Sequence, residues 1–314
     1  MSIFEIILPI LSISCIGWAL IKFNVISEGA RNGTSTLTFS ILIPALLFKG
    51  MYEAREIEQL NILYLLSFYI PLIVTYFLSR YLFNKFLFPD RVHATIAGLS
   101  ASYSNTVLVG IPVLLNYMGS EAILPAFVII SIHAGFLLTL SSYLVTAAEA
   151  GSMNLRSLAK AFYTSLRNPI IFSLLLGFIF NYFDIPLFAW LESVLSSLSK
   201  AALPVALIVL GSALASYKLS DGIYTSLMIS LIKLVMLPAL VCFLSHKVFS
   251  LSPILSSVAV ILAAMPVGIM SYSFAENRKD IAPTVASSIL LINPALHHHH
   301  TPLALYACSI GVAN

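Results

Sequence analysis

The chain has 314 residues, of which 59% are hydrophobic and only 9% are charged. Soluble domains carry roughly a quarter charged residues, so the composition excludes an ordinary soluble domain and predicts an all-α integral membrane protein in the lipid bilayer. The formal net charge of +3 comes without a basic run or tail, which excludes nucleic acid as a partner.

Hydrophobic segments of about 20 residues, the length that an α-helix needs to cross a bilayer, recur along the chain. They predict ten transmembrane helices, at Ile3–Lys22, Thr34–Met51, Asn61–Phe83, Val92–Tyr117, Ile123–Ala147, Asn168–Phe183, Ala189–Ser216, Gly222–Phe249, Pro253–Ala275 and Ala282–Ala307. A polar segment after the fifth helix divides the chain into a first half (1–150), a cytoplasmic linker (151–165) and a second half (166–314).

The two halves resemble one another. Three proline or glycine positions of the first half recur 160 positions later (169−9, 177−17 and 204−44): Pro9 with Pro169, Gly17 with Gly177, and Pro44 with Pro204. Because each half has an odd number of predicted spans, the second copy must insert upside down. The sequence therefore predicts two inverted five-helix repeats, a known plan of secondary transporters.

The distribution of lysine and arginine predicts the orientation. Most of these residues outside the spans lie in the loops after the odd-numbered helices, whereas the opposite face carries only Arg55 and Lys247. Positively charged loops stay in the cytoplasm, so we expect both termini outside the cytoplasm.

Two of the predicted spans are interrupted. The fourth contains Gly110 and Pro112, and the ninth contains Pro266 and Gly268. Proline removes a backbone donor and glycine is a poor helix former, and irregular backbone is tolerated inside a membrane only where protein buries it or a cavity hydrates it. Matched breaks in two halves are typical of a transporter binding site, with the fourth and ninth helices broken and crossing. The alternative is that the prolines only kink two continuous helices.

Polar residues accompany the first break. If a second half-helix begins close to Pro112, and another after Pro266, their positive dipole ends face the gap and attract a carboxylate or another anion. Asn105 can donate two hydrogen bonds to such a ligand. The expected substrate-binding residues are Asn105, Thr106, Gly110, Ile111, Pro112, Pro266, Val267 and Gly268.

Three other residues are candidates for coupling or for structural charge. Lys233 lies in the middle of the eighth span, where an ammonium group is costly; it either stands in for a coupling cation or fixes two helices together. His133 either relays protons or satisfies a hydrogen bond. Glu276 lies near a span end, and no carboxylate lies clearly at mid-span, which disfavours a sodium or proton site built on Asp or Glu.

The sequence contains none of the common catalytic or nucleotide-binding motifs. Nothing resembles a hydrolase elbow, a Walker loop, a zinc-protease motif or a Rossmann fingerprint, so we expect neither an enzyme nor a cofactor. The run His297–His300 lies in the tenth span. Consecutive histidines point around a helix, so at most two could share one ion, and we expect no metal site there; whether the run is natural or inserted stays open.

Three motifs resemble the auxin efflux carrier family, which includes the plant PIN carriers and bacterial malonate or malate permease-type members. They are Ser-Asn-Thr-Val-Leu-Val-Gly-Ile-Pro at 104–112, Ala-Ala-Met-Pro-Val-Gly-Ile at 263–269 followed by Phe-Ala-Glu at 274–276, and Leu-Ile-Pro-Ala-Leu-Leu at 42–47. The resemblance implies the fold of the bile-acid symporter superfamily, with scaffold and transport domains each assembled from both repeats. It also implies an organic-anion substrate at the crossover, contacted by Asn105, and a homodimer; the short linker suits a bacterial inner-membrane member.

The sequence thus predicts a secondary transporter that moves a small organic anion, an auxin-like aromatic acid or a dicarboxylate such as malonate or malate, by alternating access. Two alternatives remain open. One is a sodium- or proton-coupled organic-acid symporter, and the other is a membrane anion sensor that does not transport.

Overall fold

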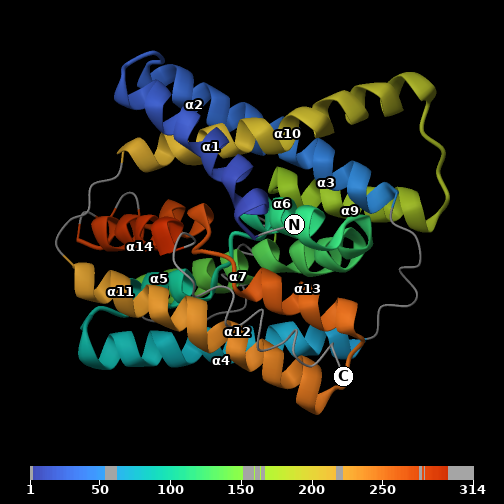
Figure 1. Ribbon diagram of the computed structural model, residues 1–314. Helices are drawn as coiled ribbons and strands as arrows, with labels where there is room; N and C mark the ends of the chain where they lie inside the picture. The colour runs from blue at the N-terminus through green and yellow to red at the C-terminus, as the bar shows by residue number, and fades with distance from the viewer. Residues whose placement is uncertain are drawn as a thin grey trace. The chain divides into compact units, whose positions relative to one another are not determined.

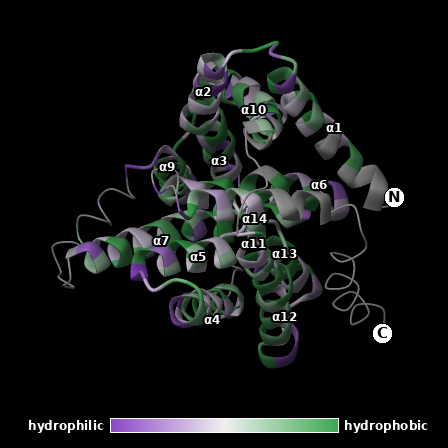
Figure 2. Cartoon of the chain, turned by 90° about the vertical axis from the view of Figure 1, so that its left-hand side faces the viewer, coloured by the Kyte–Doolittle hydropathy of each residue, from purple (hydrophilic) through white to green (hydrophobic). Residues whose placement is uncertain are grey.

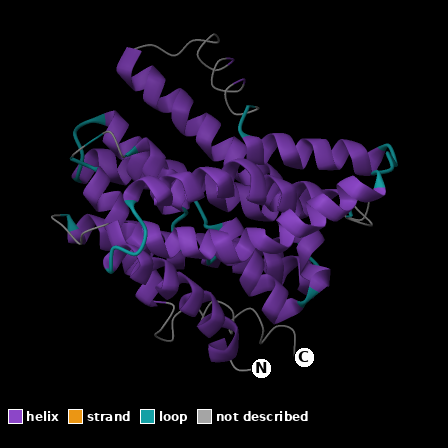
Figure 3. Ribbon diagram, turned by 90° about the horizontal axis from the view of Figure 1, so that it is seen from above, coloured by secondary structure: helices purple, strands orange, loops and turns teal. Residues whose placement is uncertain are grey.

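The computed structural model describes residues 3–53, 62–150, 159, 163, 167–216, 222–275, 278 and 280–295. Figure 3 shows this part of the chain as helices joined by short loops, and none of its residues forms a strand. The predicted all-α class is confirmed. Within these residues, five helices are long and apolar enough to cross a membrane: Glu28–Tyr52, Ile62–Phe86, Ser120–Glu149, Ala189–Ser212 and Ile223–Val248.

The chain forms two compact units, each built from separate stretches of sequence. Unit 1 comprises Met1–Gln59, Ile111–Gly135 and Thr164–Ser216, and unit 2 comprises Leu60–Gly110, Phe136–Tyr163 and Tyr217–Asn314. Each unit therefore draws on both halves of the chain.

In unit 1 the helix α10 packs along α1, α2 and α3, and α9 packs on α3 (Figure 1). Ser27 starts α2 by accepting a hydrogen bond from the Ala30 amide, so the helix begins before Thr34, where the hydrophobic pattern had placed it. The elements of this unit are α1 (Ile3–Lys22), α2 (Glu28–Leu37), η1 (Thr38–Leu42), α3 (Ile43–Tyr52), α6 (Ile111–Met118), η4 (Ser120–Ala122), the start of α7 (Ile123–Ala150), α9 (Pro169–Tyr182) and α10 (Ala189–Ser216).

In unit 2 the helix α4 packs on α5, α12 and α13, and α11 packs on α14. Hydrophobic residues run along the length of α12, as Figure 2 shows. The elements are α4 (Ile62–Phe86), α5 (Arg91–Ser102), η3 (Thr106–Gly110), the rest of α7, α11 (Ile223–Leu231), η5 (Ile232–Met236), α12 (Leu237–Cys242), η6 (Phe243–Val248), α13 (Pro253–Ala263), η7 (Ile269–Phe274) and α14 (Ala282–Ala295).

Glycines allow two close helix contacts in unit 1. A Cβ atom at Gly17 would lie 2.1 Å from the carbonyl oxygen of Ile208, and one at Gly177 would lie 2.6 Å from that of Phe48. Both members of one contact are 160 positions from their counterparts in the other (177−17 and 208−48). The spacing found in the sequence thus recurs in the packing of α1 on α10 and of α9 on α3.

Three π-helical segments, η1, η3 and η5, each end two residues before a proline: Pro44, Pro112 and Pro238. Proline has no amide hydrogen, and its ring crowds the carbonyl four residues earlier, which here lies inside each wide segment. Widening the helix relieves this crowding without ending the helix. These prolines therefore change the winding and leave the chain helical.

Several helices begin or end at, or within one residue of, the ends of the predicted spans. The helices α1 and α10 have the predicted bounds, and α9 begins at Pro169 because the Asn168 side chain accepts from the Ile170 amide at 2.9 Å. The end of the tenth predicted span, the run His297–His300 and Glu276 lie outside the described residues.

Candidate functional site

The first break follows α5, whose start is capped by Asp90. The helix ends at Ser102 because Tyr103 adopts an extended conformation, with φ −78° and ψ 112°. Helical winding resumes at Thr106, and the Asn105 carbonyl accepts from the Gly110 amide at 3.1 Å. The interruption is therefore confined to residues 103–105.

This corrects the expectation that the second half-helix begins close to Pro112. The helix begins at Thr106, and Gly110, Ile111 and Pro112 lie within its course through η3 and α6. The π-helical winding of η3 accommodates the proline, as described above. Consequently the positive end of this half-helix lies directly after Asn105.

The second break follows α13, which ends at Ala263. Gly268 is extended, with φ −74° and ψ 137°, and the 3₁₀ helix η7 begins after it. Ser271 hydrogen-bonds back to this break: its amide and its hydroxyl both donate to the Gly268 carbonyl, at 3.0 and 2.8 Å. The break thus lies where Pro266 and Gly268 had placed it.

The two breaks pair with each other. The Asn105 amide donates to the Pro266 carbonyl at 2.8 Å, and the Gly268 amide donates to the Tyr103 carbonyl at 2.9 Å. Between these bonds Ser104 and Val267 oppose each other in an isolated antiparallel bridge. Residues more than 160 positions apart therefore satisfy each other's backbone groups in a buried place where water is scarce.

Two glycines permit this approach. A Cβ atom at Gly268 would lie 2.3 Å from the Tyr103 ring, and one at Gly110 would lie 2.8 Å from Leu262 Cδ2. Gly268 faces an aromatic ring and, at 3.2 Å, the backbone oxygen of Ser104, whereas at Gly110 the close atom is the end of a leucine side chain, which can move. Gly110 and Gly268 therefore act in the structure as packing positions of the breaks.

All of the expected substrate-binding residues are buried, and most come together in unit 2. Asn105 is 6% exposed and Thr106 is 4% exposed. Ile111 and Pro112 belong to α6, which is assigned to unit 1. The sequence reasoning missed Tyr103, whose carbonyl and ring both contact Gly268; a tyrosine next to the motif carried no signal of its own.

Lys233 and His133 lie in different units. Lys233 is completely buried in η5, and its Nζ donates to the Ala263 carbonyl at the end of α13, at 2.5 Å. His133 is 1% exposed in α7. Of these two residues, Lys233 is the one that hydrogen-bonds to the helix end before a break.

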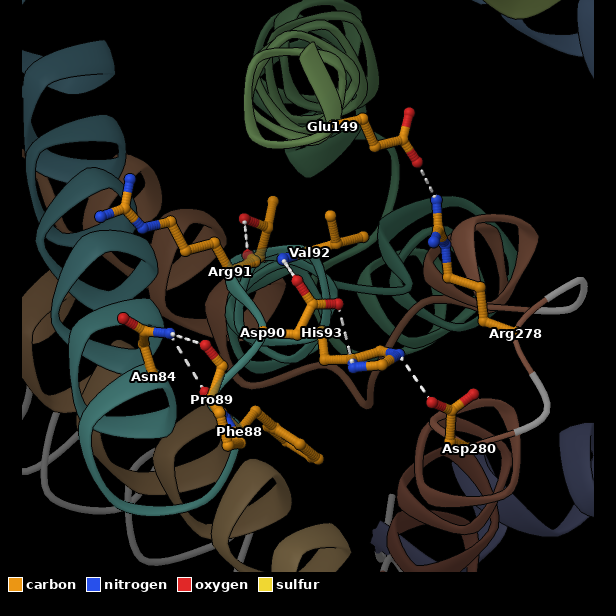
Figure 4. Close-up of polar contacts among 11 residues, drawn as sticks. Asn84, Phe88, Pro89, Asp90, Arg91, Val92, His93, Glu149, Arg278 and Asp280 are labelled. Carbon is orange, nitrogen blue, oxygen red and sulfur yellow. Dashed lines mark hydrogen bonds and ion pairs between the residues drawn. The ribbon is translucent and has the colours of Figure 1, made fainter. Parts of the chain in front are cut away.

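A charged cluster lies at the ends of three elements of unit 2 (Figure 4). The His93 ring lies between two carboxylates, with Nδ1 3.2 Å from Asp90 and Nε2 3.3 Å from Asp280, and Arg278 contacts Glu149 at 2.5 Å. Among the described residues, no group of three or more His, Cys, Asp or Glu side chains is arranged to hold a metal ion. The cluster thus joins α5, α7 and the segment before α14 through charge.

A model of the family described as "Membrane transport protein" matches residues 2–304. The chain belongs to this family. The match confirms the resemblance to the auxin efflux carrier family found in the motifs. A protein of Methanothermobacter thermautotrophicus, described as an uncharacterized transporter, is 26% identical over 306 residues, which cover 95% of this chain and 96% of that protein. The chain is therefore a multi-pass membrane transporter, and both similarities point to transport rather than catalysis.

Proposed function

We propose that this protein is a secondary carrier that moves a small organic anion by alternating access, and that the anion binds beside the paired breaks. The observation that carries the proposal is the double hydrogen bonding of Asn105 to Pro266 and of Gly268 to Tyr103. Two interrupted helices from corresponding places in two halves are the arrangement that transporters use to build a substrate site.

The chemistry of this place favours an anion. The half-helix that starts at Thr106 has its positive dipole end beside Asn105, and its first amide, that of Thr106, donates to the Ser104 carbonyl at 2.9 Å. In a bridge of this kind the amides of the two opposed residues, Ser104 and Val267, point away from each other. The site residues that we propose for the substrate carboxylate are Asn105 and Thr106, with Val267 in the opposite break and Gly110, Ile111, Pro112, Pro266 and Gly268 shaping the backbone around it.

The cargo that we propose is an auxin-like aromatic acid or a short dicarboxylate such as malonate or malate. Family resemblance supports this choice, and a carrier driven by the membrane potential alone agrees with the lack of a carboxylate clearly at mid-span in the sequence. An anion that leaves a cell with a negative interior gains about 2.3 kcal/mol per charge for each 100 mV. Efflux by membrane potential alone therefore needs no coupling ion.

The architecture that we propose has ten helices in two inverted repeats, with crossing fourth and ninth helices. The equivalent contacts of Gly17 with Ile208 and of Gly177 with Phe48 support the repeat. Scaffold and transport domains assembled from both repeats are in accord with unit 1 and unit 2, since each contains stretches of both halves.

We further propose an inner-membrane homodimer with both termini outside the cytoplasm. The charged cluster supports one part of this topology: His93, Glu149 and Arg278 come from segments that the inverted arrangement places on the same, cytoplasmic face. Family resemblance alone supports the homodimer and the inner membrane. A reporter fused after Asn314 that is active outside the cytoplasm is the expected outcome for the orientation.

The decisive experiment replaces Asn105 with alanine and measures uptake of labelled malonate, malate and indole-3-acetate into proteoliposomes, together with binding in detergent. We expect a loss of roughly tenfold to a hundredfold in affinity, because a hydrogen bond to a charged group contributes about 1.5–3 kcal/mol. The matched control is Asn84→Ala, whose amide donates to the Phe88 carbonyl away from the breaks. Wild-type affinity in Asn105→Ala would contradict the site.

The same measurements separate the two alternatives. Varying sodium and pH independently identifies a symporter, because its uptake then follows one of these gradients. Specific binding with flux at background identifies a sensor. The carrier that we propose shows both binding and flux, and its flux follows the membrane potential.

A further inference from the structure

Lys233 is a completely buried lysine whose partner is a backbone carbonyl. Its side chain has no exposed surface, and Nζ donates at 2.5 Å to the carbonyl of Ala263, the last residue of α13. Within the part of the chain that the structure describes, the ion pairs involve Lys49, His93 and Arg278. Thus no described carboxylate neutralises Lys233.

The end of α13 explains the need for this ammonium group. The last turn of a helix leaves four carbonyls without partners inside the helix. The amides of Ala264 and Met265 serve the three carbonyls before Ala263, and Lys233 serves the carbonyl of Ala263 itself. The lysine therefore completes the end of the helix that leads directly into Pro266 and the paired breaks.

The position of this contact, at the C-terminus of α13 beside the paired breaks, is relevant to transport. A helix C-terminus carries partial negative charge, and in transporters with interrupted helices such ends and the neighbouring carbonyls hold the coupling cation. We infer that the end of α13 is a subsite for a monovalent cation and that the ammonium group of Lys233 is its tethered occupant. This inference rests on the proposed transport function for its role in the carrier, and it means that the anion binds without a sodium ion at this subsite.

The π-helical winding of η5 contributes to the same contact between Lys233 and α13. Lys233 lies inside this π-helical segment, which ends two residues before Pro238 and contacts α5. Single wide turns of this kind are frequent at functional sites. The segment holds the ammonium group against α13 while α12 packs along that helix.

The test compares Lys233→Ala, which opens room for a small cation, with Lys233→Met, which fills the room without charge. Purified variants are heated in detergent with and without millimolar methylammonium chloride, a cation that matches the lost ammonium group. We expect methylammonium to raise the unfolding temperature of Lys233→Ala, because a ligand that binds only the folded state stabilises it. Wild type and Lys233→Met should not respond. If Lys233→Ala is recovered only when methylammonium is present during purification, and not with choline, that also supports the subsite.

Transport provides the second readout, with malonate, malate or indole-3-acetate in proteoliposomes. Wild-type uptake should be the same in sodium and choline salts, Lys233→Met should be at least roughly tenfold slower because a buried carbonyl is left unpaired, and methylammonium should restore only Lys233→Ala. Sodium-dependent wild-type uptake, full activity of Lys233→Met, or no response of Lys233→Ala to methylammonium would each overturn the inference. If wild type transports none of these anions, the proposed function fails, and the thermal experiment still decides the subsite.

Discussion

Tyr103 and Gly268 contact each other in two ways. The Gly268 amide donates to the Tyr103 carbonyl at 2.9 Å, and the Tyr103 ring lies 2.3 Å from the place that a Cβ atom of residue 268 would occupy. With the ring in this position, the backbone bond leaves no room for a side chain at residue 268. This relationship makes the pairing of the two breaks testable by single substitutions.

We expect Gly268→Ala to destabilise the protein and to slow transport. The added methyl group meets the ring of Tyr103 and comes within 3.2 Å of the Ser104 carbonyl oxygen, and overpacking of this kind costs about 1–3 kcal/mol. Thermal unfolding in detergent and uptake into proteoliposomes measure the two effects. Gly33→Ala is the matched control, since nothing lies within 4 Å of a Cβ atom there.

The ring of Tyr103 is the part that can yield. We expect Gly268→Ala to cost less in a Tyr103→Leu background than in wild type, with a coupling free energy of at least about 0.5 kcal/mol, as contacting residues usually show. Equal costs in the two backgrounds would mean that the ring does not set the requirement for glycine.

The two breaks show how much of the site could be predicted from the sequence. Pro266 and Gly268 located the second break correctly, because both residues disfavour a helix and occur together. Pro112 misplaced the first, because a wide helical turn can accommodate a proline, and the extended conformation of Tyr103, which ends α5, has no residue signature. The hydrogen bonds between the breaks depend on tertiary packing, which no local pattern encodes.

The two glycines of unit 1 should respond alike to substitution. Gly17→Ala and Gly177→Ala each place a Cβ atom against a backbone carbonyl, of Ile208 and of Phe48, and backbone yields less readily than a side chain. We expect each to lower the unfolding temperature, by an amount corresponding to about 1–3 kcal/mol. Gly29→Ala, where the nearest atom is 3.8 Å away, should have little effect, and a tolerated Gly177→Ala would argue against equivalence of the two contacts.

The charged cluster should contribute little to stability and respond to salt. Arg278 and Glu149 are partly exposed, and exposed ion pairs typically contribute about 0–1 kcal/mol. Arg278→Glu should therefore cause a small loss of stability at low ionic strength, and the exchanged pair Arg278→Glu with Glu149→Arg should recover it. In 1 M salt the difference should vanish, because the Debye length falls to about 3 Å. A loss that persists at high salt would point to packing instead of charge.

Asn105→Asp separates a structural role of Asn105 from a role in binding. Aspartate has nearly the same size as asparagine and is equally favourable at the start of a helix, here the one that begins at Thr106. A carboxylate at this position nevertheless repels an anionic substrate. We therefore expect a folded protein whose uptake, relative to wild type at the same pH, is lowest at alkaline pH and rises as acidification protonates the new carboxyl group. The ratio of variant to wild-type uptake between about pH 3.5 and pH 8, a range that spans the reference pKa of about 3.9 for Asp, is the measurement. A ratio near one at every pH would show that the substrate does not approach residue 105, whereas a uniformly low ratio with a lowered unfolding temperature would assign Asn105 a role in folding.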